Sequence, residues 1–141
     1  MIINRCRQLI LLAVGILFCG SASAEFVSGV FLTETNDEGG YLHVEMTVCE
    51  SDAQRQCGII KRAYNVNEGP SPILDYEHLG KLMVWDMEDH GDGSFSGGKI
   101  WAPDVDKTYK SKMKISEDGN TLSVDGCILF ICRGQDWTRV E

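Results

Sequence analysis

Hydrophobic and polar residues alternate along most of the chain beyond residue 25, and this period of two predicts β-strands. The clearest case is the segment 41–49, in which Leu42, Val44, Met46 and Val48 alternate with more polar residues, as in a half-buried strand. In the segment 109–115 lysines occupy every second position, which marks the face toward solvent. No segment beyond residue 24 shows the 3.6-residue period of an amphipathic helix.

Turn-forming residues divide these alternating segments. Turns are predicted at 36–40 and 89–93, and Asp118-Gly119 is the strongest hairpin signal in the chain. The adjacent Gly97 and Gly98 predict a bulge or bend within a strand. A long loop is predicted over 65–76, which holds two of the three prolines. The rest predicts eight or nine short strands, within the segments 26–34, 41–49, 57–64, 79–87, 95–101, 109–115, 122–124 and 127–140.

Short strands at this spacing are typical of a β-barrel or a β-sandwich. An antiparallel meander that closes on itself removes the exposed edges that would otherwise pair with other chains. We therefore predict an all-β fold, with a small closed antiparallel barrel of about eight strands.

The first 24 residues have the three parts of a cleavable signal peptide. Arg5 and Arg7 form a positive region, the segment 9–18 is an apolar run, and Ala22-Ser23-Ala24 fits the cleavage pattern. The apolar run is shorter than the ~20 residues of a membrane-spanning helix. We expect cleavage after Ala24, which leaves a single periplasmic or secreted domain over 25–141.

Charge excludes two classes of partner. All 21 acidic residues and 11 of the 13 basic residues lie beyond residue 24, so the segment 25–141 carries a formal net charge of −10. Nucleic-acid binding needs clustered Lys and Arg against phosphates, and an anionic membrane surface attracts basic segments. We expect neither as a partner, whereas a basic protein partner is compatible with this charge.

Signal cleavage would remove Cys6 and Cys19 and leave four cysteines. Lipidation of Cys19 is disfavoured, because the bulky Phe18 precedes it. An even number of cysteines in an exported chain indicates disulfides. Four cysteines allow three connectivities, of which the two local pairs Cys49–Cys57 and Cys127–Cys132 are the simplest. Neither pair has the C-x-x-C spacing of a zinc site.

Other candidate sites have simpler explanations. Four carboxylates gather in the segment 86–92, at Asp86, Glu88, Asp89 and Asp92, but His90 stands where a calcium loop needs an oxygen ligand. We interpret this segment as an acidic hairpin turn. The three histidines, His43, His78 and His90, are interpreted as solvated surface residues. We predict no metal, no cofactor and no catalytic residue, and the chain is more easily explained as a binding protein than as an enzyme.

Large apolar side chains in the strand segments lead to two interpretations. Trp85, Trp101, Tyr109, Met113 and Trp137 either fill the barrel or line a cavity, since a barrel of about eight strands has room for side chains or for one small ligand. We take Trp85, Trp101, Tyr109 and Met113 as candidate ligand-binding residues.

The C-terminal half also resembles a bacterial family, domain of unknown function 2147. The segments that carry the resemblance are Gly97–Pro103, Lys107-Thr108-Tyr109, Asp118–Leu122, Gly126-Cys127, Ile131-Cys132-Arg133 and Gln135–Val140. The pair Cys49 and Cys57 also fits, and Gly29-Val30-Phe31 stands where that family commonly has Gly-x-Trp. The resemblance implies an exported protein with a lipocalin-like closed barrel and a small-ligand site inside it, and it supplies no catalytic residues.

Two hypotheses for function follow. The first is an exported protein that holds a small, largely apolar ligand in a β-barrel, where aromatic side chains supply contact area and a few polar groups orient the ligand. The alternative is an acidic interaction or inhibitor module, which would bind a basic envelope protein through loops such as 86–92.

Overall fold

The structure is a computed structural model that describes residues 25–141 of the chain. The predicted signal peptide over 1–24, with its cleavage site and two cysteines, lies outside the described residues. Eight strands follow one another along the chain: β1 (Gly29–Leu32), β2 (Gly40–Val48), β3 (Arg55–Asn65), β4 (Leu82–Asp89), β5 (Ser94–Ala102), β6 (Lys107–Ile115), β7 (Thr121–Ile128) and β8 (Ile131–Arg139).

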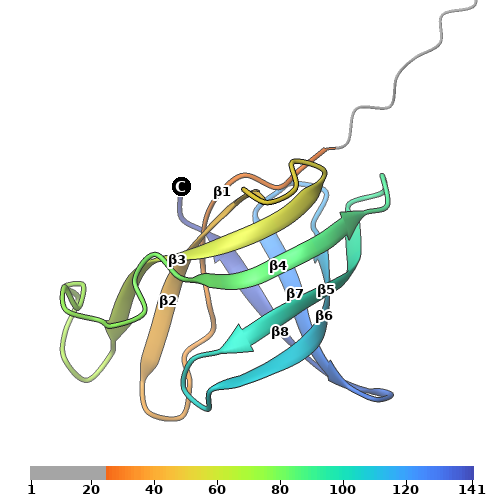
Figure 1. Ribbon diagram of the computed structural model, residues 1–141. Coiled ribbons are helices and arrows are strands. Elements are labelled where there is room, and N and C mark those ends of the chain that lie inside the picture. The colour runs from red at the N-terminus through yellow and green to blue at the C-terminus, as the bar shows by residue number, and fades with distance from the viewer. Residues whose placement is uncertain (1–24) are drawn as a thin grey trace, which may run out of the picture.

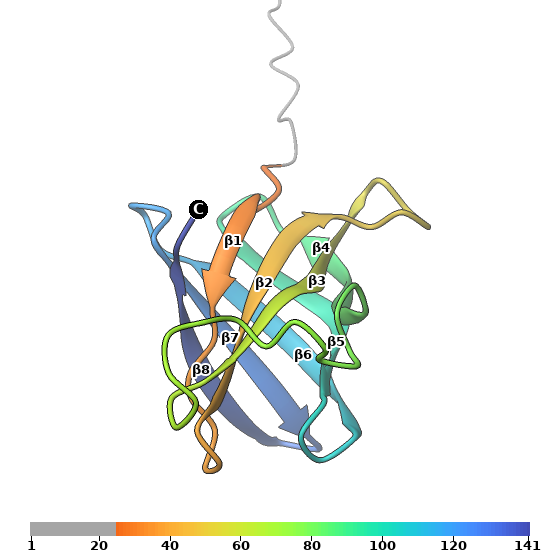
Figure 2. The same ribbon diagram turned by 90° about the vertical axis from the view of Figure 1, so that its left-hand side faces the viewer.

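The eight strands form a closed antiparallel barrel in which each strand pairs with its neighbours in sequence (Figures 1 and 2). Strand β1 closes the barrel against β8, with Phe31 opposite Arg139 and Leu32 opposite Thr138. The contact is short, because it joins β1 only to the C-terminal end of β8, and the rest of β8 pairs with β7 alone among the described residues. The predicted all-β fold and its closed antiparallel barrel are confirmed.

The core lies inside the barrel, where every second residue of a strand points. In β2, Val44 and Met46 are buried, as are Leu122 and Val124 in β7. These side chains belong to one apolar cluster with Trp137. The alternation that predicted the strands is therefore the pattern that builds the core.

The predicted turns have the expected side-chain contacts. Asn36 Oδ1 accepts hydrogen bonds from the backbone N–H groups of Glu38 (3.0 Å) and Gly40 (2.8 Å). Asp118 Oδ1 accepts one from the backbone of Asn120 at 3.0 Å. Short Asn and Asp side chains stabilise turns in this way.

The predicted bulge at the two adjacent glycines is also present. The register between β5 and β6 shifts between Phe95 and Gly98, and Gly97 has a φ of +77°. A Cβ atom at Gly98 would overlap the carbonyl oxygen of Trp85. Glycine is therefore required at position 98 because the β4 backbone passes too close for a side chain.

Several strand boundaries differ from the prediction, and β7 runs through Cys127 to Ile128, which the prediction placed in the last segment. The first strand covers only Gly29–Leu32, and the fourth begins at Leu82 rather than at residue 79. The backbone turns before β4, since Gly80 has a φ of +81° and the N–H of Leu79 bonds to the carbonyl of Tyr76 at 3.3 Å. The loop over 66–81 is consequently longer than predicted.

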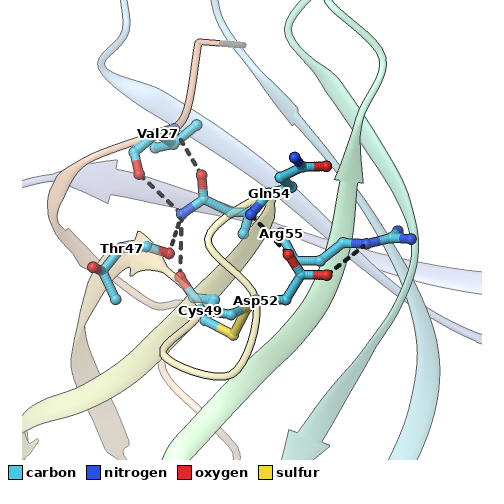
Figure 3. The surroundings of a disulfide bond; sticks show 8 residues. Val27, Thr47, Cys49, Asp52, Gln54 and Arg55 are labelled. Carbon is cyan, nitrogen blue, oxygen red and sulfur yellow. Dashed lines mark hydrogen bonds and ion pairs between the residues drawn. A yellow bond between two sulfur atoms is a disulfide. The ribbon is translucent and has the colours of Figure 1, made fainter.

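The segment that precedes β1 closes one end of the barrel, since its Val27 is buried in the apolar core. Figure 3 shows Val27 there with Thr47 and Cys49. Gln56 is fully buried, and its side chain bonds both backbone groups of Val27: Oε1 accepts from N–H at 2.7 Å and Nε2 donates to C=O at 2.9 Å. The same Nε2 donates to the carbonyl of Thr47 at 2.8 Å. Gln56 thereby holds the buried Val27 over this end.

Both local cysteine pairs are disulfides. Cys49–Cys57 lies beside Gln56 at the closed end and is buried, and Cys127–Cys132 links β7 to β8 near the other end. Disulfides are typical of exported proteins. Among residues 25–141, we find no helix with the length and apolar character to cross a membrane.

Candidate functional site

A cavity of about 1050 Å³ occupies the end of the barrel opposite Val27. Four connections surround its mouth: the β1–β2 turn, the loop over 66–81, the β5–β6 turn and the β7–β8 turn. Figure 2 shows the three turns at the lower end of the barrel, away from the chain's first described residues, and the loop over 66–81 crossing in front of the barrel above them. A volume of this size falls at the upper end of the range for sites of small organic ligands.

The wall of the cavity follows the two-residue period of the strands. On β7 and β8 every lining residue of the two strands points inward: Val124, Gly126, Ile128, Ile131, Arg133, Gln135 and Trp137. Other strands add mainly apolar side chains, namely Leu42, Ala63, Met83, Ile100 and Tyr109. The deep wall is therefore apolar, and the polar groups of β8 lie nearer the mouth.

The structure separates the four candidate ligand-binding residues. Tyr109 lines the cavity. Met113 points inward on the same strand but is buried within the apolar core cluster. Contact of these side chains with a ligand stays a prediction, and the geometry supports it for Tyr109.

The two tryptophans Trp85 and Trp101 do not line the cavity, because strand alternation turns them outward. Val84 pairs with Ile100 on the inner face, so the adjacent pair, Trp85 and Lys99, falls on the outer face. Trp101, next to Ile100, does not line the cavity either, although it is partly buried and packs against the core cluster and His78. Its indole N–H donates to Asp106 Oδ1 at 2.9 Å.

The loop over 66–81 supplies cavity residues that the sequence analysis missed. Ile73, Tyr76 and His78 line the mouth, because backbone hydrogen bonds from Ile73 to Ala63 and from Gly80 to Ile60, both 2.8 Å, hold the loop against β3. The one signal available in the sequence was the presence of Ile73 and Tyr76 among turn-forming residues.

His78 is not the solvated histidine that the sequence predicted. Its side chain is 17% exposed and packs edge-on against Tyr76 and Trp101, with ring centroids 5.2 and 4.9 Å apart. Its ring nitrogens contact Lys81 Nζ at 2.9 Å and Glu77 Oε1 at 3.3 Å.

Tyr76, beside His78, has a raised pKa because of burial and of the carboxylates of Asp104 and Glu77. The Tyr76 hydroxyl therefore stays protonated and can donate a hydrogen bond at the mouth.

The rim of the mouth is unusually apolar for a protein surface. Four consecutive residues at the β7–β8 turn are exposed: Ile128 by 60%, Leu129 by 88%, Phe130 by 101% and Ile131 by 73%. All four line the cavity mouth, and the Cys127–Cys132 disulfide joins the two strands just behind them. Exposed apolar groups of this kind mark contact sites.

The acidic segment 86–92 lies on β4 and the β4–β5 turn, outside the cavity. Glu88 pairs with Arg55 at 3.5 Å, and Asp89 and Asp92 accept backbone hydrogen bonds from Gly91 (2.8 Å) and Ser94 (3.0 Å). These contacts give the carboxylates a role in the local turn, and a protein partner for them stays a prediction. Among residues 25–141, no cluster of three or more His, Cys, Asp or Glu side chains has the geometry to hold a metal ion.

The sequence profile of one bacterial family matches residues 29–139, and that family is described as an uncharacterized protein conserved in bacteria (DUF2147). The chain belongs to this family. A solved structure, protein HP1028 from Helicobacter pylori, described as belonging to the lipocalin family, superposes with a TM-score of 0.63 and 16% sequence identity. The match covers 84% of this chain and 85% of that one, so the two share a fold. A comparison with curated protein sequences finds no match.

The last strand of this DUF2147 protein places its polar groups with the same alternation. Arg133, Gln135 and Trp137 are two residues apart and line the cavity. Cys132, which precedes Arg133, and Asp136, which lies between Gln135 and Trp137, point outward. The C-terminal segment that carried the family resemblance is therefore a wall of the candidate site.

Proposed function

We propose that this protein is an exported binding protein that holds a small, largely apolar ligand in the cavity of its barrel. The observation that carries the proposal is the cavity of about 1050 Å³, which lies between the apolar inner wall and the exposed apolar rim. Removing apolar ligand surface from water contributes about 25 cal/mol per Å². A mouth lined by Tyr76, Arg133 and Gln135 supplies polar groups that orient a ligand.

Export is the second part of the proposal. Signal cleavage after Ala24 leaves Val27 as the third residue, which is the residue held by Gln56 at the closed end. The two disulfides support export, because disulfides form and persist mainly in the oxidising compartments outside the cytoplasm. An intact mass of the protein from a periplasmic fraction should equal that of residues 25–141 with four fewer hydrogens than the reduced chain.

Ligand binding is tested with the neutral fluorescent probe N-phenyl-1-naphthylamine and a variant that fills the cavity. Gly126 lines the cavity, and a Cβ atom there would meet its nearest neighbours at 3.5 Å, an ordinary contact distance. Gly126→Leu should therefore preserve the fold and weaken probe binding about tenfold or more, because the side chain occupies ligand space.

Lys110→Leu is the matched control, since Lys110 is exposed on the outer face of the barrel. It adds an apolar side chain without filling the cavity and should bind the probe as the wild type does. If the wild type binds no probe, or if both variants bind equally well, the proposal is wrong.

A further inference from the structure

A polar hollow adjoins the apolar cavity at its mouth, and the inference drawn from it rests on the proposed function. The hollow measures about 470 Å³. It shares Glu38, Asp104, Arg133 and Gln135 with the larger cavity. A single ligand can therefore occupy both spaces, with an apolar part in the barrel and a polar part in the hollow.

One side of the hollow consists of hydrogen-bond donors from β8. The indole N–H of Trp137 donates to Gln135 Oε1 at 2.9 Å, which fixes the orientation of the amide and leaves its NH₂ group free of partners among residues 25–141. Arg133 lies two residues before Gln135 on the same inner face. Together they present a guanidinium, which binds carboxylate or phosphate oxygens through charge-assisted hydrogen bonds, and an amide that adds neutral N–H donors.

Three carboxylates line the same hollow from other elements. Asp37 and Glu38 come from the β1–β2 turn, and Asp104 comes from the β5–β6 turn. No carboxylate in the described part of the chain lies within 4.0 Å of the Arg133 guanidinium. The hollow thus contains a guanidinium and three carboxylates that form no ion pair with one another, with open space between them.

We propose that the ligand is an amphiphile with a zwitterionic head. Its anionic group binds Arg133 and Gln135, its ammonium group faces Asp104 and Glu38, and its hydrocarbon chain extends into the barrel past Tyr109. A purely anionic head would meet the repulsion of three carboxylates, and a purely cationic head would leave the donors of Arg133 and Gln135 without an acceptor from the ligand.

The test compares four single-chain amphiphiles of equal chain length, each below its critical micelle concentration. They are lysophosphatidylethanolamine (zwitterionic), a monoalkyl phosphate (anionic), an alkylamine (cationic) and a monoacylglycerol (neutral). The affinity of each is measured from its displacement of N-phenyl-1-naphthylamine from the protein. The zwitterion should bind about tenfold more tightly than the neutral compound, the difference expected for charge-assisted hydrogen bonds at a partly exposed site.

Two arginine variants identify the head-group contact. Arg133→Met should remove the tenfold advantage of the zwitterion and leave the affinity for the monoacylglycerol unchanged. Arg55→Met is the matched control, because Arg55 lies at the closed end of the barrel, and it should keep the advantage. Raising the salt concentration should reduce the advantage in the wild type, since exposed charges are screened.

The outcomes separate this inference from the proposed function. Probe binding without any preference for the zwitterion, or with tighter binding of the anionic or cationic compound, overturns the zwitterionic head and leaves the apolar site standing. An advantage that survives Arg133→Met overturns the assignment of Arg133. Absence of probe binding to the wild type overturns both proposals.

Discussion

The indole N–H of the fully buried Trp137 donates to the side-chain oxygen of Gln135, two residues earlier on the same strand, at 2.9 Å. Both side chains line the cavity, so this bond joins the core of the barrel to its polar mouth. A buried tryptophan generally needs a partner for its N–H group, and here that need also fixes the orientation of the Gln135 amide. The stability of the barrel and the geometry of the site therefore depend on the same contact.

Replacing Gln135 tests this dependence. Gln135→Met removes the acceptor and should lower the free energy of unfolding by about 1–2 kcal/mol, because the Trp137 N–H loses its partner in a largely apolar wall. Gln135→Glu retains an acceptor and should unfold close to wild type. Urea unfolding followed by circular dichroism measures both, and equal midpoints for wild type and Gln135→Met would show that the bond contributes nothing.

At the closed end, Gln56 should be among the most sensitive polar residues. Gln56→Leu leaves the N–H and C=O of Val27 and the carbonyl of Thr47 without their side-chain partner. We expect a loss of roughly 2–4 kcal/mol in the free energy of unfolding. Gln54→Leu is the control, since Gln54 is exposed in the β2–β3 turn and should change stability by less than about 0.5 kcal/mol.

The two disulfides should differ in their accessibility to reductant. Cys49 and Cys57 are 2% and 3% exposed, whereas Cys127 is half-buried and Cys132 is exposed. Mild reductant followed by alkylation and peptide mass spectrometry should therefore label Cys127 and Cys132 first. Labelling of Cys49 and Cys57 in the folded protein at the same rate would contradict this order. Each bond contributes about 2–3 kcal/mol in the chain-entropy account, so complete reduction should lower the unfolding midpoint substantially.

The sequence predicts the barrel because the strands β2, β6 and β7 each bury one face, and alternation then defines which residues point inward. It does not assign Trp85 to the outer face, because the segment 79–87 is apolar on both faces and shows no clear alternation. It does not assign Trp101 either, because the bulge between Phe95 and Gly98 shifts the alternation before that residue. Asp86 has a φ of +57°. This backbone irregularity in β4 could not be predicted from the residues around it.

The mouth of the cavity was predictable only in part for a related reason. Tyr109 is identified by its place in an alternating strand. Tyr76 and His78 reach the mouth because their loop bonds to β3 residues ten and twenty positions away, and such long-range contacts have no signature in a single sequence. Arg133 and Gln135 look like surface residues by type, and only the strand register shows that they line the cavity.

His43 should make stability depend on pH. Burial and the Arg62 guanidinium lower the pKa of His43 from 6.5 in the unfolded chain, and Glu141 opposes them. The Arg62 Nε–H also donates to His43 Nδ1 at 3.2 Å. The unfolded state therefore takes up the proton first as the pH falls. The stabilising contribution is complete above pH 6.5 and is lost as the pH falls through 6.5 toward the folded pKa.

His43→Gln removes the titrating group and should flatten the fall in unfolding free energy between pH 7.5 and pH 5. Urea unfolding at half-unit pH steps measures the two slopes. Identical slopes for variant and wild type would show that other groups cause the dependence.

Leu129, at the tip of the β7–β8 turn, should lower the stability of the protein and strengthen its binding of a ligand. It has a φ of +54°, a conformation that is unfavourable for a residue with a Cβ atom, and its side chain is 88% exposed at the cavity rim. Leu129→Gly relieves this strain, but glycine also has a larger backbone entropy in the unfolded chain. The net result should be an increase of about 0.5–1 kcal/mol in the free energy of unfolding. The same change should weaken probe binding, because it removes an apolar group from the rim.

Leu129→Ala is the control. It loses most of the side chain but keeps the strain, so it should weaken binding without raising stability. If alanine stabilises the protein as much as glycine does, the backbone conformation is not the cause, and if neither variant weakens binding, the exposed tip takes no part in holding the ligand.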